Sequence, residues 1–265
     1  MARVAKLRIW RGDASGGQLR DYDVPWEEGM VLLDVLHVLQ ATQAGDLAVR
    51  WNCKAGKCGS CSAEVNGKPR LMCMTRMSSL DTAAPITVAP MKTFPVLRDL
   101  VTDVSFNFEM AKRVPAFKPG PKGPDGKYRM MQEDIDRVQE FHKCIECFLC
   151  QNVCHVIRDH PENKAHFAGP RLFVRYAALE MHPLDTNDRA ELLKAKMGLG
   201  MCNITKCCTE VCPESIKNRQ RDHPAQGAGG GSVLRSAQVG VAEDDRRGQR
   251  VDVVTRVGLL TRSTP

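Results

Sequence analysis

Alternating apolar and polar positions predict that the first part of the chain, residues 1–90, is built mainly from β-strands. Apolar residues alternate with polar ones over 4–9 and again over 19–24. Residues 31–39 instead carry valine and leucine at helical spacing. This spacing predicts one amphipathic helix of about three turns.

A hairpin and a last strand complete this first part. Asn66-Gly67 stands between two apolar runs and is typical of the turn of a β-hairpin. The apolar run 86–89 predicts a further strand. We therefore expect a mixed sheet with a single helix, not alternating strands and helices.

The second part follows a stretch rich in proline and glycine, residues 115–126, which cannot continue a helix or a central strand. Beyond it, Ile135, Val138 and Phe141 share one face of a predicted helix. Two later helices are predicted by apolar residues at similar spacing: Leu172, Val174, Ala178 and Leu179 in the first, and Leu192, Leu193 and Met197 in the second. We expect this part to be all-helical.

From residue 225 the composition changes to a glycine-rich run and then an arginine-rich tail, which is typical of disorder. The predicted fold class is α+β. We place the first domain at 1–105, the helical domain at 106–222, and the disordered tail at 223–265.

Charge and hydropathy exclude two classes of function. Lys and Arg number 38 and Asp and Glu 31, so the net charge is +7. This balance is mild, and no basic stripe is interleaved with aromatic residues, so we expect no nucleic-acid partner. No apolar run approaches the ~18 residues of a membrane helix. Residues 1–10 carry charges where an export signal would be apolar, which predicts a cytoplasmic chain.

Cysteine is the unusual component, with 12 residues that fall into three groups of four. The cytoplasm keeps thiols reduced, so we expect metal or redox chemistry in place of disulfides.

The first group has the spacing of a plant-type [2Fe–2S] site, with three close cysteines and a distant fourth. Its members are Cys53, Cys58, Cys61 and Cys73. Gly56 and Gly59 allow the tight backbone that brings three thiolates around two irons. We expect the fourth cysteine to arrive on the hairpin strand. A zinc site is the alternative, but zinc favours paired C-x2-C units.

The second group has the spacing of a bacterial ferredoxin run, in which the fourth cysteine serves the other cluster of a pair. Its members are Cys144, Cys147, Cys150 and Cys154. The third group is the partner run, with Cys202, Cys208 and Cys212 at the matching positions. Thr205 stands where the middle cysteine of that run belongs, so one ligand is missing.

This missing ligand predicts two different clusters. Cys144, Cys147, Cys150 and Cys212 form a complete set for a [4Fe–4S] cluster. Cys154, Cys202 and Cys208 leave one corner without a thiolate, which suits a [3Fe–4S] cluster. The remaining cysteine, Cys207, we interpret as a small buried thiol that points elsewhere.

Taken together, these motifs resemble the iron–sulfur subunit of succinate dehydrogenase and fumarate reductase. The resemblance covers residues 5–218 and includes the segment 51–61, the hairpin turn 66–68 and the segment 94–103. It implies an N-terminal β-grasp plant-type [2Fe–2S] ferredoxin domain, followed by an all-α bacterial-ferredoxin-like domain with the [4Fe–4S] and [3Fe–4S] clusters.

The resemblance also implies a function and partners. Such subunits carry electrons between a flavoprotein subunit, where succinate or fumarate reacts at FAD, and quinone at a membrane anchor. The expected quinone is menaquinone near the [3Fe–4S] cluster, with haem b in the anchor. The chain would then lie peripherally on the cytoplasmic face of the cell membrane. It departs from the family where His155 follows Cys154 and Asn203 follows Cys202, so no quinone-contacting residue is assigned.

The chain itself contains no recognisable nucleotide, flavin or dicarboxylate site, so we expect no catalytic residue in it. Two alternatives remain open. One is an iron–sulfur subunit of another flavin-linked oxidoreductase, or a soluble multi-cluster electron carrier. The other, more remote, is a zinc-stabilised interaction module.

Overall fold

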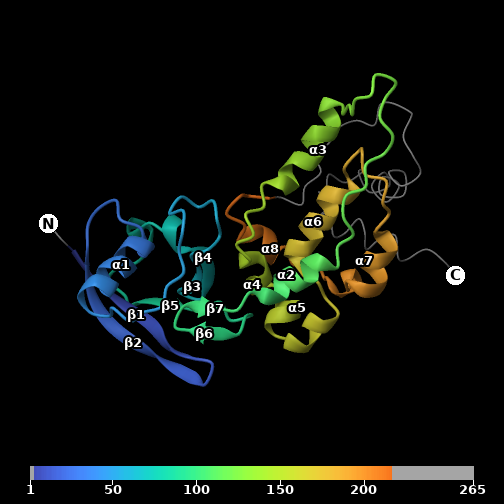
Figure 1. Ribbon diagram of the computed structural model, residues 1–265. Coiled ribbons are helices and arrows are strands. Elements are labelled where there is room, and N and C mark those ends of the chain that lie inside the picture. The colour runs from blue at the N-terminus through green and yellow to red at the C-terminus, as the bar shows by residue number, and fades with distance from the viewer. Residues whose placement is uncertain (1–2, 217–265) are drawn as a thin grey trace, which may run out of the picture.

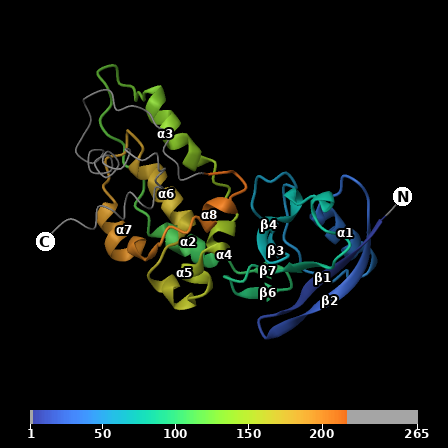
Figure 2. The same ribbon diagram turned by 180° about the vertical axis from the view of Figure 1, so that it is seen from behind.

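A computed structural model describes residues 3–216 of the chain. The predicted tail 223–265 and the end of the predicted helical domain lie outside these residues. Figures 1 and 2 show a strand-rich part and a helical part side by side. Within residues 3–216, no helix is both long and apolar enough to cross a membrane.

The strand-rich part is a seven-stranded mixed sheet. β1 and β5 pair in parallel, and every other pair of strands is antiparallel. The strands are β1 (Arg3–Asp13), β2 (Gly16–Trp26), β3 (Ser62–Val65), β4 (Lys68–Leu71), β5 (Ile86–Ala89), β6 (Val96–Arg98) and β7 (Val101–Thr102). Asn66-Gly67 turns β3 back into β4, with Val65 opposite Lys68, so the predicted hairpin is confirmed.

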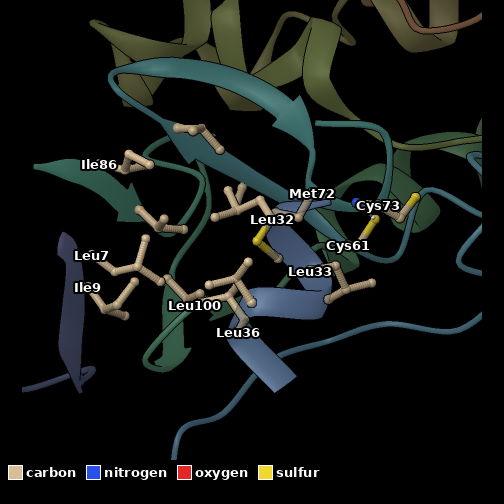
Figure 3. Close-up of a cluster of buried hydrophobic side chains, with 14 of the residues drawn as sticks. Leu7, Ile9, Leu32, Leu33, Leu36, Cys61, Met72, Cys73, Ile86 and Leu100 are labelled. Carbon is tan, nitrogen blue, oxygen red and sulfur yellow. Dashed lines mark hydrogen bonds between the residues drawn. The ribbon is translucent and has the colours of Figure 1, made fainter. Parts of the chain in front are cut away.

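The helix α1 (Leu32–Thr42) covers this sheet and forms the main core with it. Figure 3 shows Leu32 and Leu36 of α1 in one cluster with Leu7, Ile9 and Ile86 of the strands. All five side chains are fully buried. Of the predicted apolar face, Leu32, Val35, Leu36 and Leu39 are buried in this helix, while Val38 is half-buried and Val31 precedes the helix as its N-cap. Two short 3-10 turns, Met72–Met74 and Met77–Ser79, follow β4.

The second part consists of helices joined by loops. The helices are α2 (Ser105–Lys112), α3 (Gln132–His142), α4 (Leu149–Val153), α5 (His155–Arg158), α6 (Pro170–Glu180), α7 (Ala190–Lys196) and α8 (Cys207–Glu210). Two 3-10 turns, Pro161–Ala165 and Leu199–Met201, precede α6 and follow α7. The α+β fold class predicted from the sequence is thus what the structure has.

Two predicted helix faces differ from the observed ones. Ile135 of α3 is 37% exposed, while Val138 and Phe141 are buried as predicted. In α6 the buried apolar residues are Leu172, Phe173, Tyr176 and Ala177, whereas Val174, Ala178 and Leu179 of the predicted face are only half-buried. The reason is that α6 packs against α2, α3 and α4 at once, so its buried surface is wider than one stripe.

The two parts share a core and a buried polar junction. Phe148, at the start of α4, belongs to the core of the sheet and packs edge-on against Phe94. Asn152 of α4 donates to Glu64 of β3 at 2.9 Å, and Arg158 pairs with the same carboxylate at 2.8 Å. These contacts fix the helical part against the sheet, and with it the loops that carry the cysteines.

Candidate functional site

The first cysteine group lies on the loop between α1 and β3 and just beyond β4. Gly56 and Gly59 of this loop both have φ of 68°, a left-handed conformation that glycine adopts at little cost. Backbone N–H groups point at the sulfurs: Ala55 and Lys57 donate to Cys53 Sγ at 3.4 and 3.3 Å. Such donors stabilise thiolate sulfur and tune a cluster that it binds.

The fourth cysteine of this group, Cys73, lies in the 3-10 turn two residues after β4 ends at Leu71. It is therefore not on the hairpin strand itself, although the hairpin does return it to the loop. Its N–H donates to Cys61 Sγ at 3.5 Å. Cys61 and Cys73 are buried while Cys53 is exposed, so one edge of the group faces the core and the other faces solvent.

The thiols of this group differ in acidity. Burial alone would raise the pKa of Cys58, but hydrogen bonds with Ser60 and Cys53 outweigh it and lower the pKa to about 7. Burial raises the pKa of Cys61 to about 12, and the nearby Cys73 and Cys58 add to this. Because iron binds thiolate and releases the proton, a bound cluster would offset this cost at Cys61.

In space the cysteines regroup: Cys144, Cys147 and Cys150 join Cys212 around a pocket in the helical part, and this set is the second group from here on. The pocket is only partly enclosed and opens to solvent. Five cysteines line it: Cys144, Cys147, Cys150, Cys208 and Cys212. The structure thus brings Cys212 to the three cysteines of the second run, as the predicted [4Fe–4S] ligand set requires.

Two left-handed residues shape the loop of this group. Glu146 and Phe148 have φ of 57° and 60°. Burial raises the pKa of Cys150 well above its usual value and that of Cys147 to about 12, and neighbouring thiols reinforce both shifts. If these closely packed thiols lost their protons, the thiolates would repel one another. A positively charged group between them would therefore be needed to hold them as thiolates.

The third group in space consists of Cys154, at the end of α4, together with Cys202 and Cys208. Burial raises the pKa of Cys154 to about 11, and Cys207 and Cys202 are close enough to add to the shift. Burial raises that of Cys208 to about 12, again with added effects of Cys207, Cys154 and Cys202. The three predicted [3Fe–4S] ligands are therefore neighbours in space.

Cys207 lies close to this group and is not the buried thiol predicted from the sequence. Its thiol is near enough to Cys154 to add to the raised pKa of that group. It is also only half-buried. Thr205 donates its hydroxyl to Cys207 Sγ at 3.3 Å. The short helix α8 begins at Cys207, directly after Lys206, which has a left-handed φ of 64°. This residue changes the direction of the chain, and the spacing of the cysteines does not reveal it.

The first two sites are in direct contact, a feature that the sequence did not predict. A Cβ atom on Gly59 would lie only 2.5 Å from Cys147 Cα. Ser62 Oγ lies 2.8 Å from the carbonyl oxygens of both Gly59 and Cys147, and its single hydroxyl proton is shared between them. Lys57 and Glu214 form a salt bridge of 2.9 Å across the same boundary. The loop after α1 and the loop before α4 are thus joined.

The donor chemistry fits iron–sulfur clusters. Within residues 3–216, no three His, Cys, Asp or Glu side chains converge tightly enough to hold a single metal ion. The cysteines lie in three groups of thiols, which is the donor type that multi-iron clusters bind. The fold and this site define an iron–sulfur protein with a sheet-based and a helical cluster domain.

Comparison with known proteins gives the family. Residues 6–109 match the family described as "2Fe-2S iron-sulfur cluster binding domain", and residues 140–216 match "4Fe-4S dicluster domain". The fumarate reductase iron-sulfur subunit of Mycobacterium tuberculosis is 33% identical over 74% of this chain and 79% of its own length. The succinate dehydrogenase iron-sulfur subunit of Bacillus subtilis is 30% identical over 74% of this chain and 80% of its own length.

A solved structure agrees with these matches. A chain of the "Mycobacterium smegmatis Sdh1 complex in the apo form" is 66% identical, covers 82% of this chain and 91% of its own length, and superposes with a TM-score of 0.80. The chain belongs to the family of iron–sulfur subunits of succinate dehydrogenase and fumarate reductase.

Proposed function

We propose that this chain carries electrons between a flavoprotein subunit, where FAD oxidises succinate or reduces fumarate, and quinone at a membrane anchor. The observation that supports this most is the succession of the three cysteine groups. Gly59 of the first group touches Cys147 of the second. Cys208 of the third group lines the pocket of the second. Three adjacent sites form a continuous route through the chain.

Each group is proposed to hold one cluster. The ligands of the [2Fe–2S] cluster are Cys53, Cys58, Cys61 and Cys73. Those of the [4Fe–4S] cluster are Cys144, Cys147, Cys150 and Cys212. Those of the [3Fe–4S] cluster are Cys154, Cys202 and Cys208. When bound, the clusters supply one-electron carriers whose potentials depend on charge, hydrogen bonds and exposure.

The chain's own residues position the three groups. Ser62 ties the first cysteine loop to the second through Gly59 and Cys147. The buried junction of Glu64 with Asn152 and Arg158 holds α4 against β3. Because these contacts are buried, the groups keep their spacing while partners bind on the outside.

The proposed partners meet the two ends of this route. Around the first group, Trp51 is 46% and Met74 59% exposed beside the solvent-facing Cys53; this edge would face the flavoprotein. The third group would face the anchor, with haem b and menaquinone as its expected contents. The chain would lie peripherally on the cytoplasmic face of the membrane.

Metal analysis and spectroscopy of the purified protein test the clusters. We expect roughly nine irons per chain, with as much acid-labile sulfide, and three distinct cluster signals. Cys212→Ser should alter the four-iron signal, whereas loss of the three-iron signal alone would overturn the ligand assignment. Stoichiometric zinc in place of iron would overturn the proposed function.

Co-purification tests the partners. Affinity isolation from membranes should recover a FAD-containing subunit and a membrane anchor, and the assembly should reduce quinone with succinate. Recovery of the iron-loaded chain from the soluble fraction without either subunit would instead support a soluble multi-cluster electron carrier.

A further inference from the structure

A buried arginine lines the same pocket as the second cysteine group. Arg171 is the second residue of α6, and its side chain is only 7% exposed. It lines the pocket together with Cys144, Cys147 and Cys150. Nothing in the spacing of the cysteines predicts a cation here.

Arg171 has more hydrogen-bonding capacity than the described residues satisfy. Its Nη2 donates to Glu146 Oε1. Its Nε is buried and has no acceptor within residues 3–216. A buried N–H normally has a partner. The missing acceptor is therefore expected to be a group that these residues do not supply, and the pocket is where such a group would bind.

The charged residues around the pocket allow Arg171 to make the electrostatic potential inside it more positive. Its partner Glu146 is 44% exposed, so water screens this carboxylate more than it screens the buried guanidinium. The other acidic residue of the lining, Glu214, is paired with Lys57 at 2.9 Å. Arg171 is the only cationic residue that lines the pocket among the described residues.

We propose that the Arg171 side chain faces the [4Fe–4S] cluster and raises its reduction potential. The inference rests on the proposed function. Reduction adds a negative charge to the cluster, and both a nearby cation and a hydrogen bond to sulfur stabilise that state. Arg171 thereby makes the middle site of the route a better electron acceptor than its thiols alone would.

A redox titration of the purified complex, followed by electron paramagnetic resonance, tests this. Arg171→Gln should lower the midpoint potential of the four-iron cluster by about 59 mV. For one electron, this corresponds to a tenfold change in the ratio of reduced to oxidised cluster. Arg171→Lys keeps the charge and should retain part of the effect. The midpoint of the [2Fe–2S] cluster should not move.

Arg175→Gln is the matched control, because Arg175 lies one turn further along the same helix but is exposed. It removes the same charge and should shift the four-iron midpoint by less than a third as much. An equal shift in both variants, or none in Arg171→Gln, would overturn the inference.

Three further outcomes keep the test decisive. If Arg171→Gln alone fails to assemble, it is combined with Glu146→Gln, so that neither charge of the pair is left alone; the double variant should have a lower four-iron midpoint than Glu146→Gln by itself, and equal midpoints overturn the inference. Absence of any four-iron signal in the unaltered protein would overturn the proposed function itself. An intact signal with unmoved midpoints would overturn only the role of Arg171.

Discussion

At the scale of single residues, Gly59 shows how the absence of a side chain lets two cysteine loops touch. Gly59→Ala would place its Cβ 2.5 Å from Cys147 Cα and strain a φ of 68°. We expect a loss of stability of about 1–3 kcal/mol, and slower electron transfer between the first two clusters. Denaturant unfolding and rapid-freeze spectroscopy during reduction measure the two effects.

Gly67→Ala is the control that introduces backbone strain without a new side-chain contact. Gly67 has a similar φ of 73°, but an added Cβ would meet nothing within 4 Å. This variant should lose some stability and transfer electrons at the normal rate. If Gly59→Ala behaves the same way, the contact with Cys147 does not govern transfer.

Thr205 is the residue that makes the third cysteine group one ligand short of a complete run. Its hydroxyl is a poor iron ligand beside thiolates. Thr205→Cys should therefore convert the three-iron site to a [4Fe–4S] cluster and lower its potential, because the new thiolate adds negative charge. Loss of the three-iron resonance in the oxidised protein is the measurement.

The neighbouring thiol provides the control for this prediction. Cys207→Ala should leave the three-iron signal of the unaltered protein in place. If that signal is lost, Cys207 is itself a ligand. If Thr205→Cys keeps the three-iron signal at full strength, Thr205 does not face the open corner.

At the scale of elements, Arg189 holds the loop between α6 and α7 to the irregular chain before α3. Its side chain is 0% exposed and pairs with Asp185 at 2.8 Å and Glu180 at 3.2 Å. It also donates to the carbonyl oxygens of Pro115 and Ala116. One buried cation thus joins three segments.

Arg189→Met should destabilise the helical part by about 3–5 kcal/mol, because it leaves two carboxylates buried without their cation. Urea unfolding of the cluster-loaded protein, followed by circular dichroism, measures the change. Arg129→Met serves as the control, since Arg129 pairs with Asp125 while 78% exposed, and should cost about 1 kcal/mol or less. Similar losses in both variants would contradict a special role for burial.

At the scale of the whole molecule, the two parts share a core yet place their cysteines on separate loops. Cys58→Ser should disturb the [2Fe–2S] cluster, since a serine oxygen is a harder ligand than sulfur. The helical part should remain folded and keep its two clusters, because the buried junction of Glu64 with Asn152 and Arg158 holds α4 without needing the first cluster. Iron content and the three resonances measure this.

Loss of all three clusters in that variant would contradict this separation. It would show that the contact between Gly59 and Cys147 transmits disorder from one loop to the other. Cys207→Ala, which leaves the first loop unaltered, controls for the general loss of a thiol.

The sequence by itself determined the features that depend on near neighbours along the chain. The hairpin at Asn66-Gly67, the apolar face of α1 and the spacing of the cysteines are local, because turn geometry and side-chain periodicity act over a few residues. Donor type and spacing alone also led to the division of ligands among three clusters, which stays a prediction.

Only the tertiary structure decided what lies between elements. The contact of Gly59 with Cys147, the place of Cys207 beside Cys154, and Arg171 in the pocket wall depend on how separate loops and helices pack. The width of the buried face of α6 has the same origin, since three helices cover it. Spacing along a chain fixes which side chains share a face, but packing decides which faces are buried and which side chains meet across them.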